Sequence, residues 1–346
     1  METDDDALRA YYERGMERDR LKDGRGELEF TRTTEIVLRR LPVAPAAVAD
    51  IGGGPGRYAL WLASLGYQVE HRDLMPLHVE QLTADAAGMT GIRTAVGDVR
   101  DIDLPDASVA AVLLLGPLYH LTDRAERVRA LRECARIVRP GGPVFAAAIS
   151  RWAIRIDGML RERLYRAYPA VTGLIDEIDR TGMLPPLGQG AFTSFLHRPG
   201  ELREETEEAG LEVADLVSVE GPAFILGDLD ERLADPADRS AVLEVARAIE
   251  RVPELIGFGP HLVATGIRPR RPAAAGNHPP RAAARRAAHH LPRPPGPRLP
   301  GGEELRHLRP HRSVRGSDAG GATGSGACGG WRSGGAGRAG CRGRGS

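Results

Sequence analysis

The sequence predicts an α/β fold, in which a mostly parallel β-sheet carries helices on both faces. Short apolar runs alternate with helix-forming segments from Val48 to Ile149, the pattern of consecutive strand–helix–strand units. The first run leads into a loop of five residues, 52–56, of which four are glycine. Backbone without side chains can approach a bound molecule closely. The loop therefore predicts a small-molecule site at the end of a strand.

The individual elements follow from the apolar periodicity. Two helices precede the sheet, at residues 4–20 and 32–41. Five strands follow, at residues 48–51, 66–73, 92–96, 109–115 and 144–149, with helices at residues 57–65, 77–87 and 124–136. Residues 151–198 are expected to form an insertion of mixed helix and loop, with helical parts at residues 152–168 and 170–180. The sheet then resumes with a helix at 199–209, a strand at 211–219, a helix at 239–251 and a strand at 261–267.

The spacing of the glycines separates two families of nucleotide-binding loops. The dinucleotide fingerprint is G-x-G-x-x-G at the start of a helix. Gly52 and Gly54 match the first two glycines, but Arg57 occupies the third position. The dinucleotide interpretation therefore fails at Arg57.

The pattern that remains, Asp50-x-Gly52-Gly53-Gly54-x-Gly56, resembles motif I of the class I S-adenosylmethionine-dependent methyltransferases (methyltransferase type 11/12-like). Further segments agree in the expected order: the second strand ends at Asp73, Gly97-Asp98-Val99 follows the third, and a turn at residues 136–142 precedes the fifth. The resemblance covers roughly residues 30–268. It implies a Rossmann-like seven-stranded sheet of order 3-2-1-4-5-7-6, whose last strand inserts antiparallel, and S-adenosyl-L-methionine as cofactor.

The same resemblance implies which residues bind the cofactor. The motif I residues would lie against its methionine end, Asp73 would accept from the ribose hydroxyls, and Asp98 with Val99 would meet the adenine. An N-terminal helix would form a lid closed by Tyr11 or Tyr12, although ordinary packing of these tyrosines is the alternative. The full set of expected cofactor-binding residues is Asp50, Gly52, Gly53, Gly54, Gly56, Asp73, Asp98, Val99, Gly116 and Tyr12.

The loop after the fourth strand is the place where catalytic groups are expected, because in this family it faces the transferable methyl group. It reads Gly116-Pro-Leu-Tyr-His-Leu121, in which Tyr119 and His120 have proton-handling side chains. Histidine titrates near neutrality, so His120 is the first candidate for a general base. The alternative is that His120 packs at the start of the following helix, which Thr122 and Asp123 are expected to cap. Methyl transfer itself needs alignment more than covalent help.

The insertion at residues 151–198 is expected to form a substrate cap above the carboxyl ends of the strands. His197, at its end, is a second catalytic candidate, with a capping or surface role as the alternative. Candidate pocket residues in or near the cap are Trp152, Arg155, Tyr165, Phe192 and Phe195, and core packing is the alternative for its aromatic residues. The Asn/Asp-Pro-Pro-Tyr/Phe loop of amino-methylating nucleic-acid enzymes is absent after strand four, which argues against a nucleic-acid base as acceptor.

Composition divides the chain near Pro269. Fifteen of the 47 basic residues but three of the 47 acidic residues lie beyond it, so residues 1–269 carry about 12 more acids than bases. The glycine-, proline- and arginine-rich residues 270–346 lack the apolar residues of a core and are expected to be disordered. Either a nucleic-acid-binding tail or a frameshift product of a GC-rich gene explains them; we favour the second. An acidic domain would repel nucleic acid.

The cysteine positions and the lack of long apolar segments exclude several further classes of protein. Cys134, Cys328 and Cys341 show neither metal-ligand spacing nor a disulfide framework, and Cys134 is expected in the core. No metal site is expected. No segment resembles a signal peptide or a membrane span, so the expected location is cytoplasmic.

The function expected from these features is methyl transfer to an O, N or C nucleophile of a small molecule. A non-catalytic cofactor-binding protein of the same fold and an RNA-directed methyltransferase are the alternatives. The identity of the acceptor and the oligomeric state are not encoded in these motifs.

Overall fold

A computed structural model describes residues 9–13, 15–22, 24–186 and 192–270. In this part of the chain, the main sheet contains seven strands: β1 (Ala47–Ile51), β2 (Gln68–Asp73), β3 (Ile92–Val96), β4 (Ala111–Leu114), β5 (Pro143–Ile149), β8 (Glu212–Ser218) and β9 (His261–Ile267). Their order across the sheet is β3-β2-β1-β4-β5-β9-β8. Counted along the sheet-forming strands, this is the predicted order 3-2-1-4-5-7-6, and the α/β fold class is confirmed.

The directions of the strands bring several predicted residues to one edge of the sheet. The pairs β1–β2, β1–β4, β2–β3 and β4–β5 are parallel, so these strands end on the same side. β9 pairs antiparallel with β5, and His261 at its start lies opposite Ile149 at the end of β5. The ends of β1, β2 and β4 and the start of β9 therefore share the edge at which open α/β sheets bind ligands.

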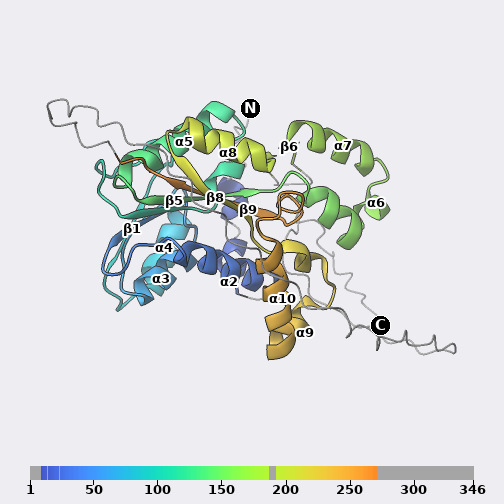
Figure 1. Cartoon of the computed structure of the whole chain (residues 1–346), viewed down its shortest axis with the longest axis horizontal. Helices are drawn as coiled ribbons and strands as arrows, with labels where there is room; N and C mark the ends of the chain where they lie inside the picture. Colours follow the sequence, from blue (N-terminus) through green and yellow to red (C-terminus); the bar gives the residue numbers. More distant parts are fainter. Residues whose placement is uncertain (1–8, 14, 23, 187–191, 271–346) are drawn as a thin grey trace, which may run out of the picture. The chain divides into compact units, whose positions relative to one another are not determined.

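Helices cover the two faces of the sheet (Figure 1). The bounds of those nearest the sheet are α2 (Gly24–Leu38), α3 (Arg57–Ser64), α4 (Pro76–Asp85), α5 (Arg124–Ile137) and α8 (Pro199–Glu208). On one face Leu131 of α5 and Leu202 of α8 belong to a core that also includes the buried Cys134, as predicted. On the other face Val37, Leu62 and Leu82 place α2, α3 and α4 in a second core.

Polar side chains determine where some helices begin. Asp123 precedes α5, and its carboxylate accepts hydrogen bonds from the backbone N–H groups of Ala125 and Glu126. Asp235 makes the same kind of cap for α10 (Pro236–Ile249), whose first residue is a proline. Both arrangements satisfy N–H groups that have no partner within the helix.

The N-terminal helices differ from the prediction. Instead of one helix over residues 4–20, the described part has a helical turn at residues 9–12 and a 3₁₀ helix, Met16–Asp19. Gly15 lies between them with φ 71°, a left-handed conformation that ends a helix. The second helix begins eight residues before the predicted Arg32, because Leu28 packs in a small core with Leu229 and Leu233.

The second half of the chain confirms one helix of the insertion and also contains elements that the periodicity did not predict. The described part of the predicted cap, residues 151–186 and 192–198, comprises a π-helix (Ile154–Arg161), α6 (Leu164–Ala167), α7 (Val171–Thr181), which matches the helix predicted at residues 170–180, and a small ribbon of β6 (Met183–Leu184) and β7 (Ser194–Phe195). Arg163, with φ 53°, divides the predicted helix 152–168. Further on, a 3₁₀ helix (Gly221–Ile225) and α9 (Leu229–Ala234) precede α10, and both are too short to give a periodic pattern.

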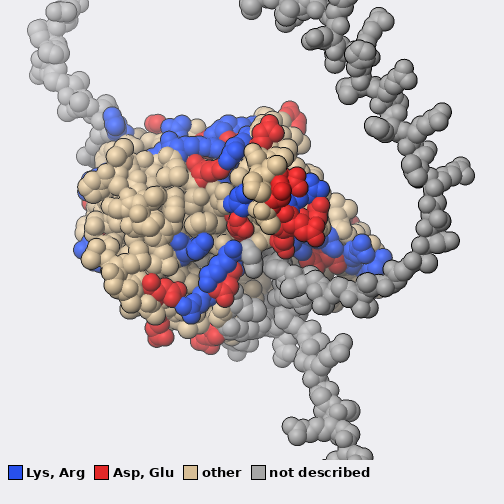
Figure 2. Space-filling view, turned by 90° about the horizontal axis from the view of Figure 1, so that it is seen from below, with Lys and Arg blue, Asp and Glu red and all other residues tan. Residues whose placement is uncertain are grey.

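The surface of the described residues is charged in a mixed pattern. Figure 2 shows basic side chains beside acidic ones on part of one face, next to a broad area without charged side chains; ion pairs such as Arg180–Glu177 and Arg251–Asp215 are examples of such neighbours. Among the helices of the described residues, none is both long and apolar enough to cross a membrane. The prediction of a disordered tail concerns residues that, after Arg270, lie outside the described part of the chain.

Candidate functional site

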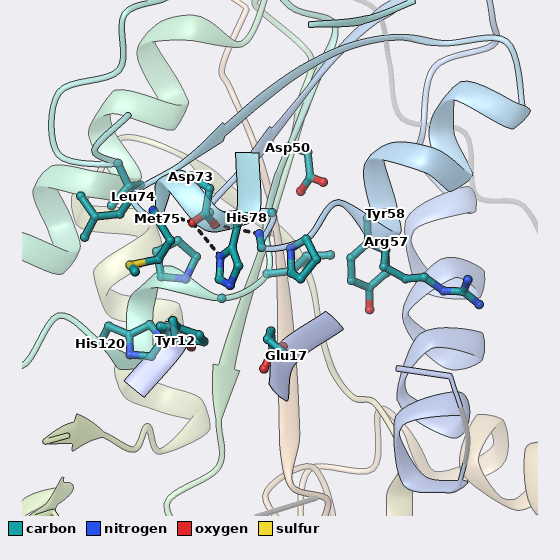
Figure 3. A pocket seen from close by; sticks show the side chains of 18 of the residues that line it. Tyr12, Glu17, Asp50, Arg57, Tyr58, Asp73, Leu74, Met75, His78 and His120 are labelled. Carbon is teal, nitrogen blue, oxygen red and sulfur yellow. Dashed lines mark hydrogen bonds and ion pairs between the residues drawn. The ribbon is translucent and has the colours of Figure 1, made fainter. Parts of the chain in front are cut away.

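A pocket lies at the edge of the sheet where β1, β2 and β4 end. Its walls come from the glycine loop, from the start of α4, from the loop after β4, and from what we call the N-terminal segment, residues 9–13 and 15–22. Figure 3 shows side chains from these elements converging on one space. Of the twelve residues predicted for the site, eleven line the pocket and Gly56 does not.

The glycine loop needs its glycines for two different reasons. Gly52, Gly54 and Gly56 have φ of 65°, 57° and 86°, in the left-handed region that favours glycine. A Cβ at Gly52 would lie 2.2 Å from Pro117, and one at Gly56 would lie 2.4 Å from Leu82. Gly56 therefore lets the loop pack against α4, while its predicted contact with the cofactor stays a prediction.

Gly54 is the glycine whose missing side chain leaves open space. A Cβ there would meet a single side-chain atom within 4 Å, the Cγ of Glu17 at 3.9 Å. Because Gly54 also lines the pocket, its backbone is accessible to a ligand.

His71 contacts the glycine loop from the second strand, and the sequence pattern did not predict this role. Its Nε2 lies 3.0 Å from the carbonyl oxygen of Gly54, and its Nδ1 lies 2.8 Å from the hydroxyl of Thr94 on β3. Burial lowers the pKa of His71 to about 4, so the ring is neutral at pH 7 and donates from one nitrogen only. The side chain links the loop to the second and third strands.

Asp73 is held in the pocket by three hydrogen bonds from the protein. Its Oδ2 accepts from the backbone N–H of Gly54 at 2.8 Å, and its Oδ1 accepts from the N–H of Met75 and from His78 Nδ1, both at 2.9 Å. Although burial favours the neutral acid, the bond from His78 lowers the pKa of Asp73, so the group is a carboxylate. This carboxylate is fixed and nearly saturated.

Asp50 has the opposite environment. It is 1 % exposed, and neither of its carboxylate oxygens has a hydrogen-bond partner. Burial, and then the nearby negative charge of Asp73, raise the pKa of Asp50 to about 7. An acid of this kind is ready to ionise when a positive charge enters the pocket.

The third wall of the pocket includes Asp98 and Val99, as predicted. Although burial favours the neutral acid, hydrogen bonds from Arg100 lower the pKa of Asp98. The Arg100 guanidinium binds both oxygens of Asp98, at 2.9 Å and 2.6 Å. Val99 is buried and lies in the core beneath. Gly116 lines the pocket where a Cβ would approach the carbonyl oxygen of Gly52 to 3.3 Å.

His120 meets the N-terminal segment across the pocket. Its Nε2 lies 2.8 Å from the hydroxyl of Tyr12, and its Nδ1 is buried without a partner. The rings of Tyr119 and Phe192 lie 4.3 Å and 4.8 Å from the imidazole. Tyr12 thus links the N-terminal segment to the loop after β4, and Tyr11, which does not line the pocket, packs against Tyr12 and Phe192.

The titration of His120 differs from the expectation. Burial lowers the pKa of His120 to about 3, because aromatic rings replace the water that would solvate an imidazolium. The ring is therefore neutral at pH 7 and does not titrate near neutrality as predicted. Asp123 caps α5, as predicted. The alternative, that His120 packs at the start of this helix, stays a prediction.

The second catalytic candidate, His197, lies outside the pocket. It is 0 % exposed, and its Nε2 lies 3.1 Å from Glu205, which also binds Arg127. Four other candidate residues also do not line the pocket. Arg155 pairs with Asp179 and Asp176, and the Phe195 ring packs against Arg127 and Arg151. Tyr165 is exposed, and Trp152 packs near Gly257. Among the predicted aromatic residues of the cap, Phe192 is the one that reaches Tyr12 and His120.

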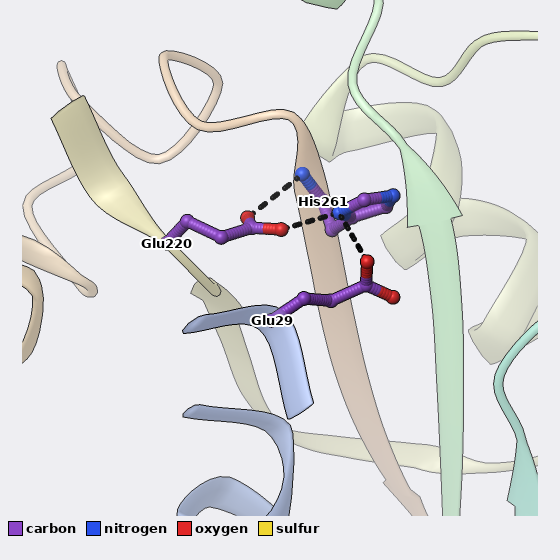
Figure 4. Close-up of side chains that lie close together, drawn as sticks. All are labelled: Glu29, Glu220 and His261. Atoms are coloured by element: carbon purple, nitrogen blue, oxygen red, sulfur yellow. Dashed lines mark hydrogen bonds and ion pairs between the residues drawn. The ribbon is translucent and has the colours of Figure 1, made fainter. Parts of the chain in front are cut away.

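An ion-pair cluster lies next to the pocket at the start of β9 (Figure 4). His261 Nδ1 lies 2.5 Å from Glu220 and 3.8 Å from Glu29, and Arg20 binds Glu29 at 2.5 Å. Although burial opposes the charge, Glu29 and Glu220 raise the pKa of His261 to about 9. This donor set is of a type that binds metal ions; in the structure His261 and the two carboxylates instead pair with each other and with Arg20. The cluster anchors Arg20, which lines the pocket.

Comparison with known proteins gives the family. The sequence profile of a family described as a methyltransferase domain matches residues 48–142. The ubiquinone biosynthesis O-methyltransferase of Xanthomonas axonopodis pv. citri is 30% identical over 186 residues, which are 53% of this chain and 69% of that protein. With the strand order, this shows that the chain belongs to the class I S-adenosylmethionine-dependent methyltransferases, and that it is a methyltransferase enzyme.

Further relatives bear related names. The ubiquinone biosynthesis O-methyltransferase of Pseudomonas aeruginosa is 31% identical over 183 residues, 52% of this chain and 70% of that protein. An uncharacterised methyltransferase of Mycobacterium bovis is 36% identical over 102 residues, 30% of this chain and 39% of that protein. Among solved structures, a SAM-dependent methyltransferase of Methanosarcina mazei has a TM-score of 0.47 at 16% identity, over 68% of this chain and 98% of that chain.

Proposed function

We propose that this methyltransferase transfers the methyl group of S-adenosylmethionine to a hydroxyl oxygen of a small-molecule acceptor. The observation that carries the proposal is the position of His120, which lines the pocket from the loop after β4 and whose Nδ1 is buried without a hydrogen-bond partner. The relatives from Xanthomonas axonopodis and Pseudomonas aeruginosa are named as O-methyltransferases, which supports oxygen as the accepting atom.

The residues of the pocket fit the cofactor. Gly54 offers accessible backbone, and Asp50 offers a buried carboxyl group without a partner, suited to the positive charge of a methionine moiety. Asp73 offers its remaining acceptor capacity to a ribose hydroxyl. When bound, the cofactor supplies an electrophilic methyl group on a sulfonium. The remaining predicted contacts are Gly52, Gly53, Gly116, Asp98, Val99 and Tyr12, all of which line the pocket.

His120 is suited to receiving the proton of the acceptor hydroxyl in the transition state of methyl transfer. A hydroxyl oxygen becomes a much stronger acid as it gains a methyl group, so even a weakly basic imidazole can take its proton at that stage. For this role Nε2 must carry the ring proton and donate it to the Tyr12 hydroxyl, which leaves the lone pair of Nδ1 free to accept a proton. Tyr119 and Phe192 exclude water around the ring.

The proposal is tested with a cofactor that carries a deuterated methyl group. The protein is incubated with this cofactor and a metabolite extract, and mass spectrometry identifies small molecules that gain one labelled methyl group. Acid-stable methyl ethers among the products would support the proposal. Labelled products methylated only on nitrogen or carbon would exclude oxygen as the acceptor, and label found only in RNA would exclude a small-molecule acceptor.

A further inference from the structure

The pocket contains a second histidine, His78, whose role the family resemblance did not assign. It lies in the first turn of α4 and is 2 % exposed. Figure 3 shows its imidazole inside the pocket, with one nitrogen turned to Asp73 and the other turned away from it. The first nitrogen, Nδ1, makes the 2.9 Å hydrogen bond to Asp73.

The bond to Asp73 determines which nitrogen of His78 carries the proton. Asp73 is ionised and can only accept, so Nδ1 must donate. In the neutral ring, Nε2 then has a free lone pair. This atom is buried and has no hydrogen-bond partner in the protein, and His78 lines the pocket. A buried acceptor without a partner is unfavourable, and here a hydroxyl donor of a ligand can satisfy it.

Asp73 alone has little capacity left for two ribose hydroxyls. A carboxylate offers about four lone-pair sites. Three of those of Asp73 are already occupied, by hydrogen bonds from Gly54, Met75 and His78. One further donor can be accommodated, whereas the ribose of the cofactor carries two neighbouring hydroxyl groups. The second hydroxyl needs another acceptor, and the free Nε2 of His78 belongs to the side chain that Asp73 itself orients.

We propose that His78 Nε2 accepts a hydrogen bond from one ribose hydroxyl of the cofactor while Asp73 accepts from the other. This inference rests on the proposed cofactor site. It makes His78 a determinant of ribose specificity, so that the pocket distinguishes a cis-diol from either deoxyribose. The proposal also links the hydrogen-bonding capacity of His78 to that of Asp73, because loss of the His78 side chain frees a lone pair on Asp73.

The experiment measures binding of S-adenosylhomocysteine and of its 2′-deoxy and 3′-deoxy forms by calorimetry. In His78→Asn, the amide nitrogen can still donate to Asp73, but no atom occupies the position of Nε2. One of the two deoxy forms lacks the hydroxyl that would donate to His78, and the wild type is expected to bind that form about 2- to 10-fold more weakly than S-adenosylhomocysteine. In His78→Asn the parent ligand should weaken by a similar factor, and the penalty for that deoxy form should disappear.

Two further variants make the result decisive. His78→Gln places an amide oxygen near the position of Nε2 and should keep the discrimination, which provides a test if the Asn variant does not fold. His197→Asn removes a buried histidine outside the pocket and should leave all three affinities unchanged. Equal weakening toward all three ligands in His78→Asn, or none, would overturn the proposal. Absence of binding to the wild type would instead count against the cofactor site itself.

Discussion

Replacement of Gly54 by Val separates ligand contact from backbone strain. The residue has φ 57°, and a side chain in the left-handed region costs about 1–2 kcal/mol or more. For a domain of this size that corresponds to a fall in Tm of roughly 2–8 °C. The added isopropyl group would have open space on the protein side, with Glu17 Cγ at 3.9 Å from the Cβ, and would therefore project into the pocket.

The assay compares Gly54→Val with a matched variant, Gly210→Val. Gly210 has φ 86°, no atom within 4 Å of an added Cβ, and a position outside the pocket. Both variants should lose thermal stability in a melting experiment. Calorimetry with S-adenosylhomocysteine should show no detectable binding to Gly54→Val and normal affinity for Gly210→Val. Normal affinity in Gly54→Val would refute the placement of the cofactor against this loop.

Three further predictions concern the rest of the pocket and the tail. His120→Ala should lower kcat about 10²- to 10⁴-fold with little change in cofactor affinity; normal turnover on an identified acceptor would remove the proposed role. Asp50 has a folded pKa of about 7, above its unfolded value, so its contribution to stability falls as pH rises from about 4 to 7. If the bound cofactor lowers the pKa of Asp50 strongly, the affinity for the cofactor should rise about tenfold from pH 6 to pH 8. Calorimetry in two buffers would measure the proton that Asp50 releases on binding. Asp50→Asn should abolish this pH dependence. Truncation after Pro269 should leave Tm and cofactor affinity unchanged, because the last backbone bonds of the sheet region are those of Arg268 with Gly141 and Gly142; a fall of several degrees would show that later residues contribute to folding.

The parts of the fold that the sequence predicts are those encoded by local patterns. The glycine loop and the carboxylates at the strand ends are local, and parallel strands bring them together wherever the exact helix ends fall. Residues 24–31 illustrate the opposite case. Gly24 and Gly26 are poor helix formers, yet α2 includes them because Leu28 packs against α9, a segment about 200 residues away.

The same distinction applies to the site. His71 and His78 look like ordinary polar residues of a strand and a helix, and their roles depend on Thr94, Gly54 and Asp73, which register and loop geometry bring near. The titration of His120 could not be read from its loop either. Its pKa depends on burial, to which Phe192 contributes from a segment 72 positions away.

The hydrogen bond between Tyr12 and His120 joins two residues 108 positions apart, and it has a kinetic consequence. If product leaves through the space beneath Tyr12, this bond must break in every catalytic cycle. If that step limits turnover, kcat should fall as solvent viscosity is raised with sucrose, and Tyr12→Phe should reduce the effect. The hydrogen bond from the His120 imidazole would then limit the rate of product release, in addition to the role of His120 as proton acceptor.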